Sequence, residues 1–310
     1  MSNVFIKTVK QILRGEKRAS LKKFLNYIDA VFGKKFKGNH FNNIYFDGNA
    51  QDCIDDNQSP LHKIIKEHQG NITDKWEQYL QIYEKIFAPF IIRAKPINIL
   101  EIGILNGGFL QVLEKFFPKG SKIIGLDIEK KCADLKLGGG GSSIEIIIGD
   151  AAQEDFLDKS FKDSKFDIII DDASHVNRNT IITFEAMFDK LNYGGIYIIE
   201  DCHTSYWNNA AGGFQRKGSV IEYFKTLIDA LHFYYIHPEI TAKIKNAYLK
   251  KFNSSIAAIY FYDSVIAVEK YVKDKTLPFR RYIAGQNAPI FRDDCALTIN
   301  QDTKFEKFFA

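Results

Sequence analysis

Two pairs of adjacent acidic residues have the type and spacing to do chemistry, because each pair directly follows an apolar run. Asp171 and Asp172 follow the first run, and Glu200 and Asp201 follow the second. If the runs are neighbouring parallel strands, Asp172, Glu200 and Asp201 converge at one edge of a sheet. Carboxylates held that close raise one another's pKa, and a hard divalent cation with oxygen ligands relieves the repulsion. The sequence therefore predicts a site for Mg²⁺, or another divalent cation, at these three carboxylates.

A histidine, His175, lies three residues after Asp172. An unperturbed imidazole titrates near ~6.5, so beside a metal-bound hydroxyl it can act as a general base. Taken singly, a paired acid at a strand end fits a capping group, and a lone histidine fits a surface or structural role. The complete set of three acids and one histidine favours catalysis, with His175 as the base.

An earlier apolar run ends in a second group of candidates, Glu101, Gly103, Asn106 and Gly107. Glycines at this point let the backbone approach a ligand closely and let a helix begin there. The spacing is G-x-x-x-G-G, not the G-x-G-x-x-G that cradles a dinucleotide pyrophosphate. It favours S-adenosylmethionine (SAM), which has no phosphate and carries an amino-acid tail. A plain strand-to-helix turn is the other interpretation.

Two further acids follow the next two apolar runs. Asp127 can accept hydrogen bonds from both ribose hydroxyls of SAM or of NAD, and Asp150, followed by Ala151, can receive the exocyclic amine of adenine. Each acid alone is as typical of a protein surface. The ordered set Glu101, Asp127 and Asp150 after three consecutive strands indicates a nucleoside site.

These residues need a scaffold, and the pattern of the chain indicates one. Helical patterns alternate with apolar runs typical of parallel strands that are buried on both faces. Five strands with crossover helices and a closing hairpin predict a doubly wound, mostly parallel, seven-stranded α/β sheet of Rossmann-like form, with an antiparallel strand at or near its edge. In such sheets ligands bind outside the carboxyl ends of the strands. The predicted strands are Ile97–Ile102, Ile123–Asp127, Ile144–Ile148, Phe166–Ile170, Ile196–Ile199, Ile256–Phe261 and Val265–Val268, and the predicted helices are 74–92 (capped by Thr73 or Asp74), 108–117, 178–191 and 219–233.

The N-terminal part differs in charge from the rest of the chain. Residues 1–38 hold ten Lys and Arg and two Asp and Glu, a net charge of +8, which leaves −4 on the remainder. Two amphipathic helices are predicted there, over 4–13 and 19–32, and they favour assembly of a homo-oligomer or a cap over the acceptor. Contact of the basic arm with nucleic acid, an anionic membrane or an acidic partner is the alternative. The predicted division is a small basic helical extension over 1–70 and one domain over 71–310.

Bulk composition argues against several classes of protein. The acidic body is not a nucleic-acid footprint, and no run approaches the roughly 20 apolar residues that span a bilayer. The N-terminus lacks the apolar core of a signal peptide. The cysteines stand singly with no C-x-x-C pair, so we expect no disulfide framework, no zinc site and a reducing cytoplasm as the compartment. They are Cys53, Cys132, Cys202 and Cys295.

The ordered acids on the nucleoside side resemble those of class I SAM-dependent methyltransferases. The segments Ile170–His175 and Glu200–Trp207 resemble a narrower family, the metal-dependent sugar O-methyltransferases of macrolide biosynthesis, of the mycinamicin and tylosin type. That family's pattern is approximately D-D-G-S-H and then E-D-x-H-T-S-Y-W. This chain departs from it at Ala173, where glycine is usual, and the added methyl removes no functional group. The resemblance covers roughly residues 72–235.

The resemblance implies a SAM-dependent O-methyltransferase that uses Mg²⁺. Its acceptor would be a hydroxyl of a sugar or glycoside, in a secondary metabolite or a surface-polysaccharide precursor. His175 would be the base and Asp172, Glu200 and Asp201 the metal ligands. The helix that carries Tyr79, with Lys75 and Tyr83 beside it, also resembles the family's segment before the first strand. The implied cofactor-binding residues are Glu101, Gly103, Asn106, Gly107, Asp127, Asp150, Ala151, Asp171 and Tyr79, and the implied acceptor-binding residues are His203, Tyr206 and Trp207.

Two functions from other classes compete with this one. A nicotinamide-dependent oxidoreductase would use the same fold and Asp127, but the glycine spacing argues against it. A non-catalytic scaffold working through its basic arm would not need Asp172, His175, Glu200 and Asp201 together.

Overall fold

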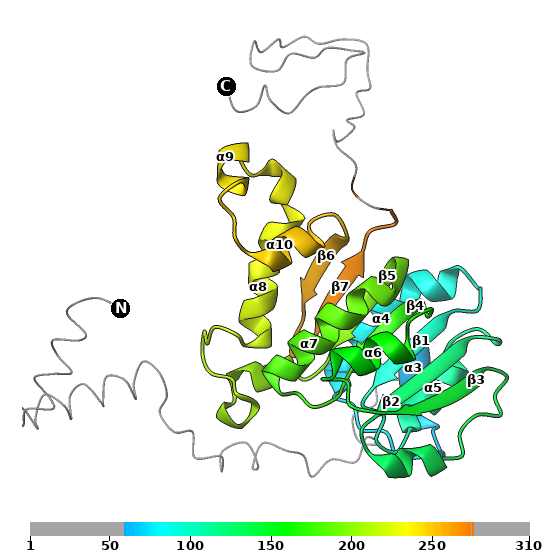
Figure 1. The fold of residues 1–310 in the computed structure, drawn as a ribbon. Helices are drawn as coiled ribbons and strands as arrows, with labels where there is room; N and C mark the ends of the chain where they lie inside the picture. The colour runs from blue at the N-terminus through cyan, green and yellow to red at the C-terminus, as the bar shows by residue number, and fades with distance from the viewer. Residues whose placement is uncertain (1–58, 274, 276–310) are drawn as a thin grey trace, which may run out of the picture.

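The computed structural model describes residues 59–273 and residue 275 (Figure 1). The two helices predicted over 4–13 and 19–32 lie outside the described residues, so the extension over 1–70 and the domain over 71–310 stay predictions. Within the described part, the chain forms a seven-stranded sheet with the order β3-β2-β1-β4-β5-β7-β6. The predicted doubly wound α/β sheet is therefore confirmed.

The five strands predicted to run parallel do so, and the closing hairpin adds two antiparallel strands. β7 pairs antiparallel with β5 and with β6, which forms one edge of the sheet. Ile199 at the carboxyl end of β5 pairs with Ile266 at the start of β7, so the turn between β6 and β7 reaches the carboxyl edge of the parallel strands. The strands are β1 (Asn98–Ile102), β2 (Lys122–Asp127), β3 (Ser143–Ile148), β4 (Phe166–Asp171), β5 (Leu191–Ile199), β6 (Ile256–Phe261) and β7 (Ile266–Lys270).

Helices cover both faces of the sheet and produce two core layers (Figure 1). Apolar side chains of α3, α4 and α5 pack on one face, and those of α6, α7, α8 and α10 pack on the other. The central strands are buried from both sides, which explains their nearly continuous apolar sequences. The helices are α3 (Pro60–Lys66), α4 (Glu77–Ile92), α5 (Gly108–Phe116), α6 (Glu154–Ser160), α7 (Asn177–Met187), α8 (Val220–Leu231), α9 (Pro238–Thr241) and α10 (Ala247–Phe252), with 3₁₀ turns η1 (Lys130–Asp134), η2 (Phe188–Lys190), η3 (Cys202–Tyr206), η4 (Asn208–Ala210) and η5 (Phe233–Tyr235).

The start of α4 differs from the prediction. The helix begins at Glu77 with Trp76 as its N-cap, so the predicted start at 74 with a cap at Thr73 or Asp74 is wrong. Residues 71–76 form no helix and instead run over the start of α5. A Cβ on Gly108 would lie 2.3 Å from the carbonyl oxygens of both Asn71 and Ile72, so this close approach requires glycine. The segment thereby carries Lys75 and Trp76 to the carboxyl edge of the sheet.

Helix α3 is absent from the predicted elements, although it belongs to the same core as α4 and α5. Its Leu61 is fully buried, and the Leu61 backbone N–H donates to Glu84 Oε1 of α4 at 2.8 Å. Only one of its residues is fully buried, so the apolar periodicity was too short to identify it.

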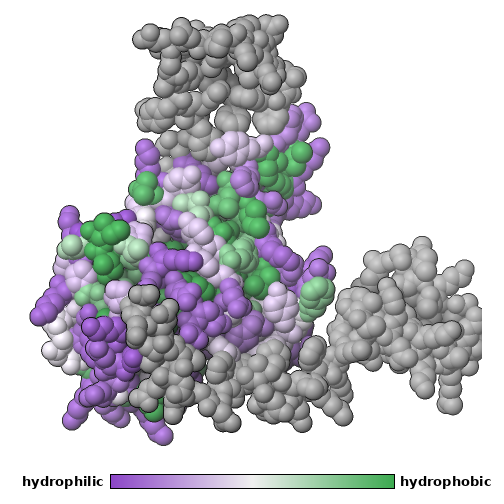
Figure 2. Space-filling model, turned by 180° about the vertical axis from the view of Figure 1, so that it is seen from behind, coloured by the Kyte–Doolittle hydropathy of each residue, from purple (hydrophilic) through white to green (hydrophobic). Residues whose placement is uncertain are grey.

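Some large apolar side chains are exposed on the surface. Figure 2 shows one face, on which hydrophobic patches alternate with hydrophilic side chains. Exposed examples are Ile92, Tyr193, Tyr260 and Val272. Across the described residues, every helix is too short or too polar to cross a membrane.

Candidate active site

A cavity of about 1290 Å³ opens at the carboxyl edge of the parallel strands. Most of the predicted site residues line it, including Asp172, His175, Glu200 and Asp201. Three predicted residues are not among the described residues that line it: Gly107, Tyr79 and Tyr206. The other predicted residues on its wall are Glu101, Gly103, Asn106, Asp127, Asp150, Ala151, Asp171, His203 and Trp207.

The loop after β1 is held against the end of β2 by Asp127. Its Oδ2 accepts hydrogen bonds from the backbone N–H groups of Ile104 and Leu105, both at 2.9 Å, and its Oδ1 accepts from Glu129 N–H at 2.8 Å. Asp150 is fixed in the same way, because its Oδ1 accepts from Ala152 N–H at 2.8 Å. Both carboxylates are therefore positioned by rigid backbone donors on the cavity wall.

Gly103 lies where the β1 loop meets the turn after β4. Its φ is +87°, and a Cβ there would lie 2.2 Å from the carbonyl oxygen of Asp172. Only glycine tolerates both the left-handed conformation and this contact. The nucleoside loop and the turn that carries Asp172 are thus packed directly together.

One carboxylate oxygen of Glu101 lacks a hydrogen-bond donor among the described residues. Its side chain is buried, and its Oε2 has no hydrogen-bond partner among the described residues. Burial raises the pKa of Glu101 to about 8, against the opposing charge of Lys75. An ammonium group such as that of the methionyl tail of SAM would satisfy this oxygen, so the residues present fit that cofactor.

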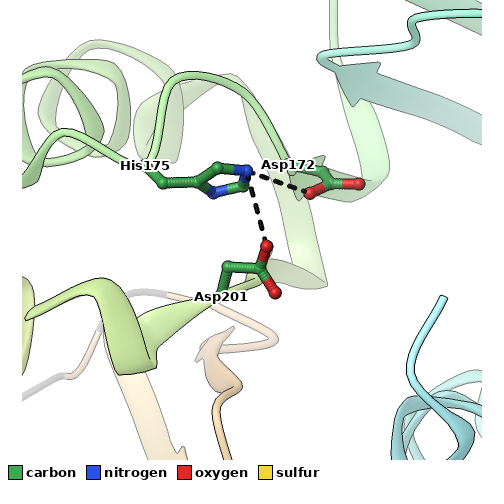
Figure 3. Close-up of side chains that lie close together, drawn as sticks. All are labelled: Asp172, His175 and Asp201. Carbon is green, nitrogen blue, oxygen red and sulfur yellow. Dashed lines mark ion pairs between the residues drawn. The ribbon is translucent and has the colours of Figure 1, made fainter. Parts of the chain in front are cut away.

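The turn after β4 and the end of β5 bring His175 between two carboxylates (Figure 3). His175 Nε2 lies 3.7 Å from Asp172 Oδ1 and 3.5 Å from Asp201 Oδ2. One ligand atom from each of the three residues falls within 4.8 Å of the others, a spacing that could hold a metal ion. The carboxylate oxygens are the donors that Mg²⁺ prefers. The donor set therefore fits a divalent cation.

Glu200 was expected to face a metal ion, and in the structure its carboxylate contacts Lys75. Lys75 Nζ lies 2.5 Å from Asp172 Oδ2 and 2.7 Å from Glu200 Oε1, and 3.9 Å from Glu101 Oε1. Burial alone would lower the pKa of Lys75, but the charges of Glu200, Asp172 and Glu101 outweigh it and raise this pKa. Asp172 and Glu200 therefore meet at the Lys75 ammonium, and the group of described residues whose ligand atoms could hold a metal ion contains Asp172 and Asp201 but not Glu200, so the predicted three-carboxylate ligand set stays a prediction.

Glu200 is buried, and it also accepts a hydrogen bond from Tyr83 of α4 on Oε1, the oxygen that contacts Lys75. Burial raises the pKa of Glu200, and Lys75 opposes that shift. The Lys75 ammonium therefore offsets part of the cost of burying this carboxylate.

Asp201 is held by a polar network behind the cavity wall. Its Oδ1 accepts hydrogen bonds from Tyr79 OH at 2.7 Å and from Trp76 Nε1 at 3.2 Å. Tyr79 OH also lies 2.9 Å from Ser264 Oγ, and that oxygen lies 2.5 Å from His203 Nδ1. Burial raises the pKa of Tyr79, which keeps its hydroxyl a donor. Tyr79 thus supports Asp201, and this placement does not favour the predicted contact with a cofactor.

Asp171 likewise has an internal partner. Its buried carboxylate accepts from Tyr197 OH at 3.1 Å, and burial raises the pKa of Asp171 to about 7. Because Asp171 also lines the cavity, its predicted cofactor role stays a prediction.

The predicted acceptor residues belong to η3 and the residue after it. The His203 ring packs edge-on against Trp207, with centroids 4.8 Å apart, and against Trp76 at 6.0 Å. Burial lowers the pKa of His203. Tyr206 is half exposed and is not among the residues that line the cavity.

Three residues that shape the site were not assigned from the sequence. The sequence places Lys75 only in a segment that resembles the family's segment before the first strand. No local pattern indicates that its ammonium lies in the site. Ser264 lies in the predicted hairpin turn, and the antiparallel pairing of β7 with β5 could have placed it at this edge. Asn177 is buried at the start of α7, donates to Ala210 O and accepts from Val220 N–H, both at 2.7 Å, and so fixes the loop after η3.

The chain is similar in sequence to known O-methyltransferases. No protein-family model matches the chain. It is 28% identical over 209 residues to the 8-demethyl-8-alpha-L-rhamnosyl tetracenomycin-C 2'-O-methyltransferase of Streptomyces olivaceus, covering 64% of this chain and 52% of that protein. It is 32% identical over 204 residues to the mycinamicin VI 2''-O-methyltransferase of Micromonospora griseorubida, covering 62% and 48%. The chain spans about half the length of these curated relatives.

Solved structures show the same resemblance. The methyltransferase MycE of the mycinamycin pathway, solved with Mg and SAH, superposes with a TM-score of 0.54 at 28% identity, covering 68% of this chain and 54% of MycE. MycE solved with Mg, SAH and mycinamycin VI gives a TM-score of 0.57 at 26% identity, covering 73% and 58%. The chain therefore has the class I methyltransferase fold and resembles the macrolide sugar O-methyltransferases.

Proposed function

We propose that this protein is a SAM-dependent O-methyltransferase that requires a divalent metal and methylates a hydroxyl of a sugar or glycoside. The observation that carries the proposal is the single cavity wall shared by Glu101, Asp127 and Asp150 on one side and Asp172, His175 and Asp201 on the other. The resemblance to sugar O-methyltransferases supports the acceptor class.

Each group has a task in this proposal. When bound, SAM would supply the electrophilic methyl group and a divalent cation would supply Lewis-acid activation of the acceptor hydroxyl. Asp172, Glu200 and Asp201 would hold that cation. His175 Nε2, already aimed between two of these carboxylates, accepts the hydroxyl proton. Holding both reactants on one wall supplies much of the rate by proximity.

The acceptor side favours a small carbohydrate. The aromatic faces of Trp207 and Trp76 beside His203 suit the apolar face of a sugar ring. We propose a glycoside of a secondary metabolite or a surface-polysaccharide precursor as the acceptor. A nucleic-acid acceptor is not favoured, because residues 39–310 carry a net charge of −4.

A methyl-transfer screen tests the proposal. The full chain is incubated with labelled SAM and a panel of free sugars, glycosides, nucleotide-linked sugars and a catechol, with Mg²⁺ or with EDTA. We expect labelled product from a sugar acceptor only when the metal is present. Activity that survives complete chelation would exclude the metal role. Label on a catechol in preference to every sugar would exclude the acceptor class.

A further inference from the structure

The proposed function gives Lys75 no task in methyl transfer, yet its ammonium lies among three carboxylates of the site. Its side chain is only 4% exposed, and its Nζ contacts two of the three proposed metal ligands, Asp172 and Glu200. A buried ammonium is costly unless carboxylates surround it, and buried carboxylates are equally costly without a cation. The lysine and the acids therefore stabilise one another in the absence of metal.

We infer that Lys75 is a built-in counter-ion for the metal ligands, which a divalent cation must displace from Asp172 and Glu200 in order to bind. This inference rests on the proposed metal-dependent function. Lys75 would be a positioning residue, because it acts through the ligand carboxylates and not on the acceptor.

Geometry supports competition between the two cations. Metal–oxygen bonds of Mg²⁺ are about 2.0–2.1 Å long, so a metal bound to Asp172 Oδ2 or Glu200 Oε1 needs the space that Nζ now fills at 2.5 and 2.7 Å. Tyr83 also donates to Glu200 Oε1, which holds that carboxylate in place whether or not Lys75 remains. The ligand side chains are thus already positioned before a metal arrives.

The structure also provides a second position for the ammonium. Glu101 Oε1 lies 3.9 Å from Nζ, and Glu101 Oε2 lacks a partner among the residues that the structure describes. The Phe109 ring lies 4.6 Å from Nζ and offers a favourable face along that side. A short rotation of the lysine side chain toward Glu101 would free Asp172 and Glu200 while its charge stays paired.

The total charge of the site favours movement of the Lys75 ammonium within the site over its removal from the site. If Glu101, Asp172, Glu200 and Asp201 are all ionised, they carry a charge of −4, and Lys75 reduces it to −3. A divalent cation and the ammonium together still leave the cluster negative. Both cations can therefore remain in the site, provided that they no longer share the same oxygens.

The test measures metal binding directly in the full-length protein, freed of metal by EDTA and dialysis. Calorimetric titration with MgCl₂ and with MnCl₂ is performed on the wild type, on Lys75→Met and on Lys75→Gln. Lys159→Met is the control, because Lys159 is exposed on α6 and its loss changes the net charge equally. We expect a metal dissociation constant at least about tenfold lower for both Lys75 variants, since a competing positive charge a few ångströms away is removed. Lys159→Met should bind as the wild type does.

Thermal unfolding provides a second readout that does not depend on activity. Without metal, Lys75→Gln should unfold at a lower temperature than the wild type, because its buried carboxylates lose their cation. Added Mg²⁺ should raise its unfolding temperature by more than it raises that of the wild type. If Lys75→Met does not fold, Lys75→Gln and a crystal structure of the metal-loaded wild type carry the test. In that crystal structure, Nζ should lie within hydrogen-bonding distance of Glu101.

The outcomes separate this inference from the proposed function. If the wild type binds metal and the Lys75 variants bind it equally or more weakly, Lys75 is no competitor and the inference fails alone. Metal bound while Nζ still bridges Asp172 and Glu200 has the same meaning. If none of the proteins binds a divalent cation, the proposed metal dependence is wrong, and the inference that rests on it is wrong as well.

Discussion

His175 and Asp201 share an uncommon backbone conformation, with φ at 51° and 52°. Residues other than glycine rarely occupy this region, and such strain concentrates where side chains must be aimed. Here it turns the imidazole and the carboxylate toward each other, to 3.5 Å. The hydrogen bonds of Tyr79 and Trp76 to Asp201 help to maintain the arrangement.

Replacing the proposed base tests its role at this scale. His175→Ala should lower kcat by about 10²–10⁴-fold, the usual contribution of general-base catalysis, while SAM still binds with near-normal affinity. Steady-state kinetics and calorimetry with SAH measure the two effects. His232→Ala is the matched control, because His232 is exposed beyond the end of α8. Near-normal turnover of His175→Ala would mean that another group takes the proton.

Single residues also show what the sequence could and could not predict. Asp172, Glu200 and Asp201 were placed together because strand ends in a parallel sheet meet at one edge, a rule that needs no atomic detail. The rule does not say which neighbour each carboxylate oxygen faces. Lys75 precedes α4 in sequence, and only the packing of residues 71–76 over α5 brings it to Asp172.

The elements that carry the site are joined at two tight contacts. One is Gly103 against the turn after β4, and the other is Gly108 against the segment before α4. Strands and helices were predictable because each has a clear period, whereas these contacts depend on backbone approach. The sequence showed the glycines and their spacing, but not the backbone that each one meets.

The Gly103 contact leads to a prediction about stability. Gly103→Ala should lower the free energy of unfolding by about 1–3 kcal/mol more than Gly138→Ala, because a new methyl group would overlap the Asp172 carbonyl. Gly138 is the matched control, since its φ is also positive, at +99°, and its Cβ would meet open space. Denaturant unfolding of both variants measures the difference. Equal losses would show that backbone strain alone accounts for the effect.

The packing of α7 on α8 leads to a prediction about pH. Burial raises the pKa of Glu185 on α7, and the Tyr223 hydroxyl and the charge of Lys251 oppose only part of that shift. A carboxyl with a raised folded-state pKa stabilises the protein at low pH and loses that contribution as pH rises through the raised value. The melting temperature of Glu185→Gln relative to that of the wild type should therefore increase as the pH rises above the ordinary glutamate pKa of about 4.3. Glu239→Gln, exposed on α9, should show no such trend.

In the whole molecule, the proposed function assigns the two reactants to two halves of one sheet. The strand ends of β1, β2 and β3 carry Glu101, Asp127 and Asp150, and those of β4 and β5 carry the metal and base candidates. This division follows from the strand order and was predictable. The acceptor pocket was less predictable, because the resemblance ends near residue 235 and gives no information about the residues that follow.

Ligand-induced stabilisation tests the nucleoside half. SAH at about 100 times its dissociation constant should stabilise the folded protein by about 2.7 kcal/mol, whereas NADH should leave the melting temperature unchanged. Differential scanning fluorimetry of the full chain measures both. A shift with NADH and none with SAH would favour the oxidoreductase, and no shift with either ligand would favour the scaffold.

The contact between Gly103 and the Asp172 carbonyl also bears on how such an enzyme can diversify. The loop proposed to bind the methyl donor and the turn proposed to carry a metal ligand are packed directly against each other, so a change in one would require a change in the other. New acceptor preferences would then have to arise elsewhere, in η3 and the loop that Asn177 anchors. Directed evolution toward another sugar should accumulate its changes there and leave the strand junction around Gly103 untouched.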